Sequence, residues 1–239
     1  LCLILKIEGM SWFDAICHSF TTIATSGFST KNASIAAYSG AIQWTIIIFM
    51  FLAATNFSLH YYFIAKGKFE YYKDQEFRYY LGICIIFSIL FFINIISTAK
   101  YQINFLTVRH SIFTAVSLLT TTGFSTEDFN NWPAMSNMLV FVLLFIGGTA
   151  GSTTGGMKII RTIVISRYLL CEVRRLLHPK GIFNIKLGNK IIDDDVVKAT
   201  LGFYLFYLFI FIITALLLST TGLDFITSLT ASAAAIGNI

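Results

Sequence analysis

Long charge-free stretches alternate with charged linkers along the chain, and this pattern predicts a membrane protein. A spanning helix needs about 20 mostly apolar residues. Four stretches meet that length, at residues 32–65, 79–99, 129–157 and 199–223. The first six residues, LCLILK, look like the end of an earlier span. We therefore expect an all-α polytopic membrane protein with four spanning helices.

Three shorter charge-poor stretches cover residues 15–30, 110–126 and 225–239 and are rich in Ser and Thr. Each is too short to cross the bilayer and return, and each lies next to a span. We interpret them as re-entrant segments, in which a half-length helix enters the membrane, turns into extended chain and leaves on the same side. Such irregular backbone must be buried in protein or line a watery path. An amphipathic helix on the membrane surface is the alternative.

Charged residues are scarce, and their positions predict the orientation. They make up 12% of the 239 residues, against roughly 25% in a soluble domain. This composition excludes a water-soluble enzyme and a nucleic-acid-binding domain. Of the 17 Lys and Arg residues, 13 lie in the linkers 66–78 and 158–198. Basic loops stay in the cytoplasm, so the net charge of +5 is an orientation signal and the re-entrant segments enter from outside.

Two of the re-entrant segments repeat one another. DAICHSFTTIATSGFST and HSIFTAVSLLTTTGFST align on Gly27 and Gly123, 96 residues apart, and share the string GFST. A repeat of this kind indicates one supersecondary unit used several times. Capping patterns at Ser11–Asp14 and Thr221–Asp224 predict helices that start outside. The carbonyl end of each short helix then points toward the membrane centre, where its partial negative charge favours a cation.

A Thr-x-Gly-Phe string follows both of these helices. Glycine adopts backbone angles that other residues avoid, which lets successive carbonyls turn to one side. Rings of such carbonyls replace the water shell of potassium in channel filters. A plain helix C-cap is the alternative for one glycine, but two copies in the same place favour a filter. The candidate residues are Thr25, Ser26, Gly27, Phe28, Thr121, Thr122, Gly123 and Phe124.

A glycine-rich stretch, GGTAGSTTGG, interrupts the third predicted span. A phosphate-binding loop is disfavoured, because Met157 separates the last glycine from Lys158 and no strand precedes it. A close helix-packing face is a second interpretation. The third is a flexible break across the ion path, since each glycine costs a helix about 1 kcal/mol. The residues that would form such a gate are Gly147, Gly148, Gly151, Ser152, Gly155 and Gly156.

Several of these strings resemble the Trk/Ktr/HKT potassium transporters, most closely the bacterial TrkH-type membrane subunits. They are SWFDAICHSFTTIATSGFST, FLAATNFSLHYY, SLLTTTGFSTEDFNNWP, GGTAGSTTGGMKIIR and the terminal AIGNI. The resemblance implies repeated span–pore helix–span units around one potassium path, with the two Thr-x-Gly-Phe strings as filter strands. It also implies that Asn238 and Ile239 begin a further filter strand, and that the glycine-rich loop gates the path below the filter.

By this likeness the chain would be a fragment made of parts of three pore units. The end of the second unit would cover residues 1–65, a cytoplasmic linker 66–78, the third unit 79–161 with its loop at 147–156, a basic connector 162–198, and the front of the fourth unit 199–239. The resemblance further implies the cell inner membrane, a homodimer, and a cytoplasmic TrkA-like nucleotide-binding subunit docked on the connector. A solvated amphipathic connector is the alternative. Potassium would be cargo, and we expect no cofactor, no other metal and no nucleic acid.

Two other function classes compete with potassium transport. A substrate-coupled secondary transporter with broken helices would carry inverted repeats, whereas the repeats here run in the same orientation. An intramembrane enzyme would need a reactive group inside a span, and Asn56 and His60 are its best candidates. No nucleophile–base arrangement and no HExxH motif occurs in the sequence, so we expect no enzyme.

Overall fold

The computed structural model describes residues 1–97, 103–178, 181, 183–188 and 190–239, and nearly all of its regular structure is helical. Within these residues two helices are long and apolar enough to cross a membrane, α5 (Gln75–Ile96) and α9 (Asp194–Ser219). A bent pair, α3 (Gly40–Ala53) with α4 (Phe57–Lys66), makes up to three. The all-α class is confirmed. Of the four predicted spans, the second and the fourth are single long helices, the third is interrupted as predicted, and the first is broken, which the sequence did not predict.

The first predicted span is broken in its middle. Its helical part begins at Gly40, after the 3-10 helix η1 (Ser34–Ala37), and the axes of α3 and α4 differ by 97° across residues 54–56. The helix restarts because the Asn56 side chain accepts a hydrogen bond from the Ser58 N–H, as an N-cap does. His60 bridges the break, with Nε2 at 2.9 Å from the Leu52 carbonyl oxygen.

The third predicted span is helical only in its first half. The 3-10 helix η2 (Phe129–Asn131) and Pro133 precede α7 (Ala134–Leu143), which is ten residues long. An irregular segment then runs to Lys158, where α8 (Ile159–Leu177) begins. The predicted interruption is therefore present, and it starts at Leu144, three residues before the first glycine.

Three short helices occupy the predicted re-entrant segments. They are α2 (Trp12–Ile23), which follows α1 (Cys2–Ile7), α6 (Phe105–Leu119) and α10 (Phe225–Gly237). Each starts at a polar N-cap side chain that accepts a backbone N–H three residues on, and the caps are Ser11, Asn104 and Asp224. The predicted cap at Thr221 is wrong, because α10 starts later and Asp224 itself is the capping residue.

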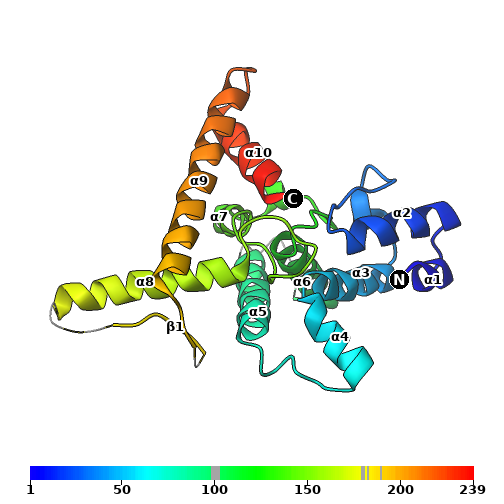
Figure 1. Ribbon diagram of the computed structural model, residues 1–239. Coiled ribbons are helices and arrows are strands. Elements are labelled where there is room, and N and C mark those ends of the chain that lie inside the picture. Colours follow the sequence, from blue (N-terminus) through cyan, green and yellow to red (C-terminus); the bar gives the residue numbers. More distant parts are fainter. Residues whose placement is uncertain (98–102, 179–180, 182, 189) are drawn as a thin grey trace.

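Helix α6 lies at the centre of the fold and packs against α3, α5 and α7 (Figure 1). Its Phe113 and Leu119 are fully buried, as are Tyr80 and Phe91 on α5. Helices α8 and α9 extend away from this centre, and α10 returns along α9 toward it. On α9, Leu205, Phe206 and Phe209 are exposed, as expected of a helix that faces lipid.

The basic connector holds a helix and a small hairpin. Most of α8 falls in it, followed by β1 (Lys186–Leu187) and β2 (Lys190–Ile191), which pair antiparallel. Helix α9 starts at Asp194, five residues before the predicted span. The predicted end of the second span at residues 98–99, and the basic residues Lys100 and Lys180, lie outside the described residues.

Candidate functional site

The two Thr-x-Gly-Phe strings have the same backbone conformation. Thr25 and Thr121 both have positive φ angles, 50° and 51°, and Gly27 and Gly123 follow at 67° and 79°. After each helix the chain also makes equivalent bonds, from Ser26 N–H to the Thr21 carbonyl and from Thr122 N–H to the Ser117 carbonyl, both at 2.9 Å. The sequence repeat is therefore also a repeat of backbone structure.

The end of α10 has the same geometry. Asn238 has a φ of 61°, and the Ile239 N–H bonds the Ala234 carbonyl, five residues back, at 2.9 Å. The bonds at Ser26 and Thr122 also reach five residues back. Asn238 thus takes the structural place of Thr25 and Thr121, and Gly237 is the last residue of the helix.

The three strands touch one another in order. A Cβ atom built on Gly27 would collide with the Thr122 carbonyl oxygen. One built on Gly123 would lie 3.0 Å from the Ile239 carbonyl carbon. Both positions therefore require glycine for two reasons. The φ angle is positive, and the next strand leaves no room for a Cβ atom.

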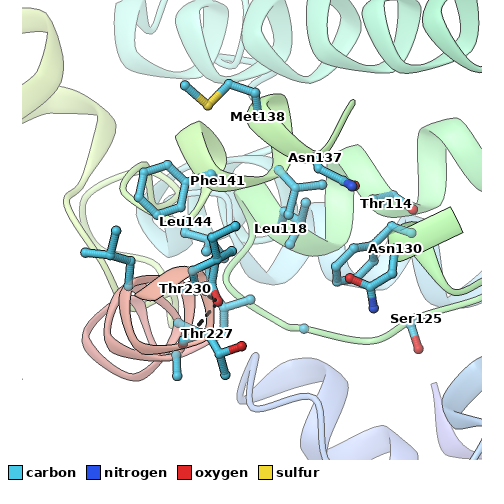
Figure 2. A pocket seen from close by; sticks show the side chains of 18 of the residues that line it. Thr114, Leu118, Ser125, Asn130, Asn137, Met138, Phe141, Leu144, Thr227 and Thr230 are labelled. Carbon is cyan, nitrogen blue, oxygen red and sulfur yellow. Dashed lines mark hydrogen bonds between the residues drawn. The ribbon is translucent and has the colours of Figure 1, made fainter. Parts of the chain in front are cut away.

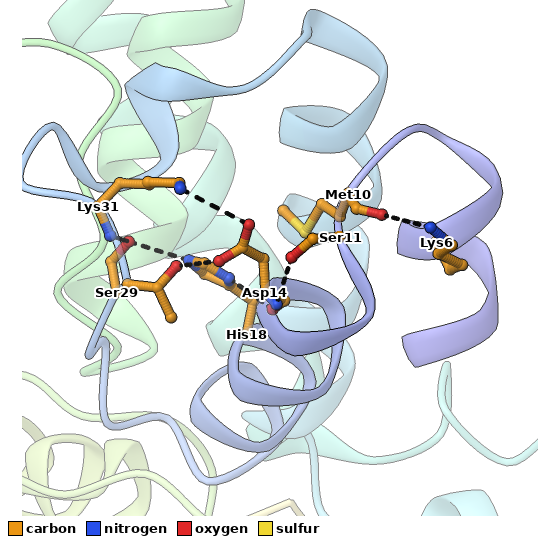
Figure 3. Close-up of polar contacts among 8 residues, drawn as sticks. Lys6, Met10, Ser11, Asp14, His18, Ser29 and Lys31 are labelled. Atoms are coloured by element: carbon orange, nitrogen blue, oxygen red, sulfur yellow. Dashed lines mark hydrogen bonds and ion pairs between the residues drawn. The ribbon is translucent and has the colours of Figure 1, made fainter.

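The strand leaving each glycine is tied back to the start of its own helix, and Figure 3 shows Asp14 and Lys31 in the first of the two units. Asp14 Oδ1 accepts a hydrogen bond from the Thr30 hydroxyl at 2.5 Å, and Lys31 Nζ lies 3.8 Å from Asp14 Oδ2. In the next unit His110 Nδ1 lies 2.7 Å from Thr126 Oγ1. Residues 14 and 110, and residues 30 and 126, are each 96 apart. We call these two contacts the outer clasps.

The glycine-rich loop (residues 147–156) lies directly against the start of all three strands. Its Gly155 N–H donates to Thr121 Oγ1 at 2.7 Å, and the Thr25 hydroxyl donates to the Thr153 carbonyl at 3.2 Å. A Cβ on Gly155 would sit 2.6 Å from the Asn238 Cβ. The structure thus brings the candidate gate residues to the candidate filter residues, on the side where the helices end.

The break between α3 and α4 holds the other side of this loop. The end of a helix leaves carbonyl groups without hydrogen-bond donors. Here the loop supplies the donors. Thr149 donates to the Ala54 carbonyl from both its N–H and its hydroxyl, each at 3.0 Å. In return the Phe57 N–H, at the start of α4, donates to the Gly151 carbonyl at 3.1 Å.

Two charged residues that no sequence motif marks hold the glycine-rich loop in place. Glu76, which is buried on α5, accepts from the Ala150 N–H at 2.8 Å and from the Ile160 N–H at 3.0 Å. Lys158 turns back into the loop and donates to the Thr154 hydroxyl at 2.7 Å and to the Thr154 carbonyl. Nothing in the pattern marks Glu76, since it reads as an ordinary first-turn acid of a helix.

The repeated strands are not identical in their surroundings. Phe124 is buried, whereas its equivalent, Phe28, is 76% exposed. A pocket of about 710 Å³ lies beside the Phe124 strand, between α7 and α10. Figure 2 shows Met138 and Phe141 of α7 facing Thr227 and Thr230 of α10 across it. The pocket also reaches Gly123 and Ile239, so it flanks the strands without lying between them and the loop.

Comparison with known proteins identifies relatives over the whole chain. A family model described as TrkH, cation transport protein, matches residues 5–239. The Trk system potassium uptake protein TrkH of Vibrio parahaemolyticus is 37% identical over 237 residues, which is 98% of this chain and 49% of that protein. The Trk system potassium uptake protein TrkG of Escherichia coli is 33% identical over 238 residues, 98% and 48% of the two chains. The chain thus spans about half the length of these relatives.

A solved structure agrees with the sequence relatives. The crystal structure of the potassium transporter TrkH from Vibrio parahaemolyticus superposes with a TM-score of 0.94 at 36% identity. The match covers 99% of this chain and 52% of that one. Together with the apolar helices, these similarities confirm the resemblance found in the sequence and a multi-pass membrane protein.

Proposed function

Because this chain belongs to the TrkH family of cation transport proteins, we propose that it forms part of a potassium transport path in the cell inner membrane. Membership of a transport family also confirms the prediction that the protein is not an enzyme. In this proposal the backbone carbonyls of residues 25–28, 121–124 and 238–239 form part of a selectivity filter, and potassium is the cargo.

The observation that carries the proposal is the threefold occurrence of one backbone conformation. Thr25, Thr121 and Asn238 share a left-handed φ at the end of a short helix, and the strands that follow are in contact. Helix ends carry a partial negative charge that favours cations. Positive φ at a β-branched residue is rare and strained, and such strain is concentrated at functional sites.

We further propose that the glycine-rich loop is the gate of this path. It is held to the strands by two hydrogen bonds, through Thr25 and Thr121, which is few enough to release. Its glycines allow large backbone changes, with positive φ already at Gly151 and Gly156. The interpretation as a helix-packing face is disfavoured, because residues 147–156 are not helical.

The family resemblance and the charge of the basic connector are the grounds for a proposal about partners. We infer a homodimer and a cytoplasmic nucleotide-binding subunit that docks on α8 and the hairpin. Helix α8 ends in Arg174 and Arg175 and begins at the loop. A partner bound to α8 would therefore act on the gate through a single rigid element.

The filter proposal is tested by replacing Gly123 with Ala in the complete protein. Alanine at a φ of 79° and 3.0 Å from Ile239 is strained, and a strain of about 1–2 kcal/mol corresponds to a roughly five- to thirtyfold change in an equilibrium. We expect potassium flux into liposomes, and its preference over sodium, to fall by that order. Gly82→Ala is the matched control, because a Cβ there meets nothing within 4 Å. Unchanged flux and preference in Gly123→Ala would contradict the proposal.

The broken α3–α4 span is also a feature of one rival proposal, a substrate-coupled secondary transporter. Broken helices also form the midplane sites of secondary transporters, and the break here is sharp, at 97°. Its freed carbonyls are already bonded to the loop, however, which leaves fewer groups for a solute. Saturable uptake of an organic solute by the same liposomes would favour this rival.

A further inference from the structure

An open apolar groove of about 650 Å³ runs between α3, α5 and α6, away from the candidate filter. One wall comes from Ile48 and Phe51 on α3, the other from Ile85 and Ile89 on α5, and Ile112 of α6 forms part of the floor. Three wall residues are at least half exposed: Ile48 at 55%, Ile85 at 50% and Ile89 at 51%. The groove is thus open at the surface of the described residues.

An open groove with such walls needs apolar atoms to fill it. A gap beside packed side chains forfeits the dispersion contacts that those atoms would otherwise make. The walls belong to helices of a membrane protein, where hydrocarbon chains surround the surface. Ser88 and Ser111 are the hydroxyl-bearing residues of the lining, and both bond a carbonyl in their own helix, Cys84 and Thr107 respectively. The groove therefore offers its occupant no free polar group.

A cationic side chain lies at the end of the groove where α3 and α6 begin. Arg109 follows the lining residue Val108 on α6, and its guanidinium rests on Gly40, where any Cβ would collide with Nη1. Trp44 and Gly40 are one turn and two turns ahead of the lining residue Ile48, on the same face of α3. The Trp44 ring contacts the Phe105 ring, with centroids 5.7 Å apart.

Arg109 has no acceptor among the residues that the structure describes. Its Nε is enclosed and makes no hydrogen bond, and none of the ion pairs formed by described residues involves it. An arginine at a membrane boundary, flanked by Trp and Phe, is placed where lipid headgroups lie. Its planar guanidinium suits a phosphate, which it can bind through two hydrogen bonds.

We propose that this groove binds a phospholipid, with one acyl chain between α3 and α5 and the phosphate on Arg109. The occupant needs one anionic end and one apolar tail, and the groove offers one cation and otherwise apolar walls. A second copy of this chain matches less well, because it would have to supply a narrow apolar ridge ending in an acid. The proposal does not depend on which ion the protein transports.

The test uses a photoactivatable phosphatidylglycerol, with a diazirine in one acyl chain, in phosphatidylcholine vesicles that contain the complete protein. We expect label on peptides of α3, α5 and α6. Ile85→Trp fills the groove and should abolish that label. Ile86→Trp is the matched control, since Ile86 is its neighbour, is 56% exposed and does not line the groove. Ile48→Phe fills the groove from the opposite wall and guards against a folding defect in one variant.

Arg109→Gln tests the headgroup contact separately. Loss of an exposed ion pair, up to about 1 kcal/mol, should weaken labelling about two- to fivefold at limiting lipid. Equal labelling in Ile85→Trp and Ile86→Trp would overturn the proposal. So would loss of self-association in Ile85→Trp without loss of label, because a second copy would then cover the groove. Labelling that is unchanged in Arg109→Gln would overturn the assignment of the phosphate.

Discussion

Thr25 and Thr121 hold a backbone conformation that β-branched residues avoid. A left-handed residue of this type costs about 1–3 kcal/mol and persists only where its surroundings enforce it. Both hydroxyls contribute to that enforcement, because each bonds the glycine-rich loop. Asn238, at the third position, is a residue type that tolerates this conformation better. The strained positions are therefore the ones in contact with the loop through a hydroxyl.

Glu76 shows how one side chain can control a segment far away in the sequence. Its Oε1 accepts the Ala150 and Ile160 N–H groups, one in the loop and one in the first turn of α8. Glu76→Ala leaves both donors without this acceptor, at a cost of about 1–3 kcal/mol for each buried group. We expect a looser loop, and hence a raised basal ion flux in liposomes.

Two variants control the Glu76 experiment. Glu76→Gln keeps a carbonyl oxygen at the same place and should restore most of the wild-type behaviour. Glu70→Ala removes an acid that pairs with Lys73 in the nearby linker and should leave the flux unchanged. If Glu76→Ala has the basal flux of the wild type, Glu76 does not hold the loop closed.

Each outer clasp joins the start of a short helix to the strand that follows that helix in the chain. The two clasps use different side chains. The threonine is kept, but its partner is a carboxylate at position 14 and an imidazole at position 110. Lys31 beside Asp14 corresponds to Glu127 in the other unit, so the sign of the neighbouring charge is exchanged as well. Different side chains therefore make the same contact between helix and strand in the two units.

We expect Thr126→Val to lower the preference for potassium over sodium. The change removes the hydroxyl that meets His110 and keeps the side-chain shape, which costs about 1 kcal/mol for a hydrogen bond of this kind. Reversal potentials under potassium and sodium gradients measure the result. Thr221→Val, at an exposed threonine whose hydroxyl bonds the Leu218 carbonyl in its own turn, serves as control. A preference equal to that of the wild type would show that the clasp does not position the strand.

Helix α4 depends on its N-cap. Asn56→Ala removes the acceptor of the Ser58 N–H, and losing an N-cap typically costs about 1 kcal/mol. We expect a lower thermal midpoint of the purified protein and faster proteolysis in the linker after α4. Asn137→Ala is a suitable comparison, because the Asn137 Oδ1 has no hydrogen-bond partner among the described residues. Equal midpoints for the two variants would argue against this role of Asn56.

The sequence predicted the re-entrant segments, the glycine-rich break and the repeat, because each leaves a local signal. Helix length, Ser and Thr content and the GFST string are all read along the chain. The break at residues 54–56 left no such signal, since it contains neither glycine nor proline. It is stabilised by Thr149 and Thr153, almost a hundred residues away. Glu76 and the outer clasps were missed for the same reason, as they exist only through tertiary contacts.

The ends of the glycine-rich loop lie side by side across the middle of the protein. The Gly147 N–H donates to the Met157 carbonyl at 2.8 Å, so removal of residues 148–155 joins neighbours without moving α7 or α8. We expect this deletion to raise potassium flux and to lower the preference over sodium, because Thr25 and Thr121 of the proposed filter lose hydrogen bonds that hold their strained backbone. A deletion variant with unaltered flux would favour a packing role.

The loop meets three strands at once, through Thr25, Thr121 and the close approach of Gly155 to Asn238. It cannot leave one strand while staying seated on the other two, since the three contacts lie within a few residues of a single short turn. If the loop is the proposed gate, its release is concerted, and we expect the pore to switch between two conductance levels. Recordings from single molecules would then show abrupt steps of one size, rather than a ladder of intermediate currents.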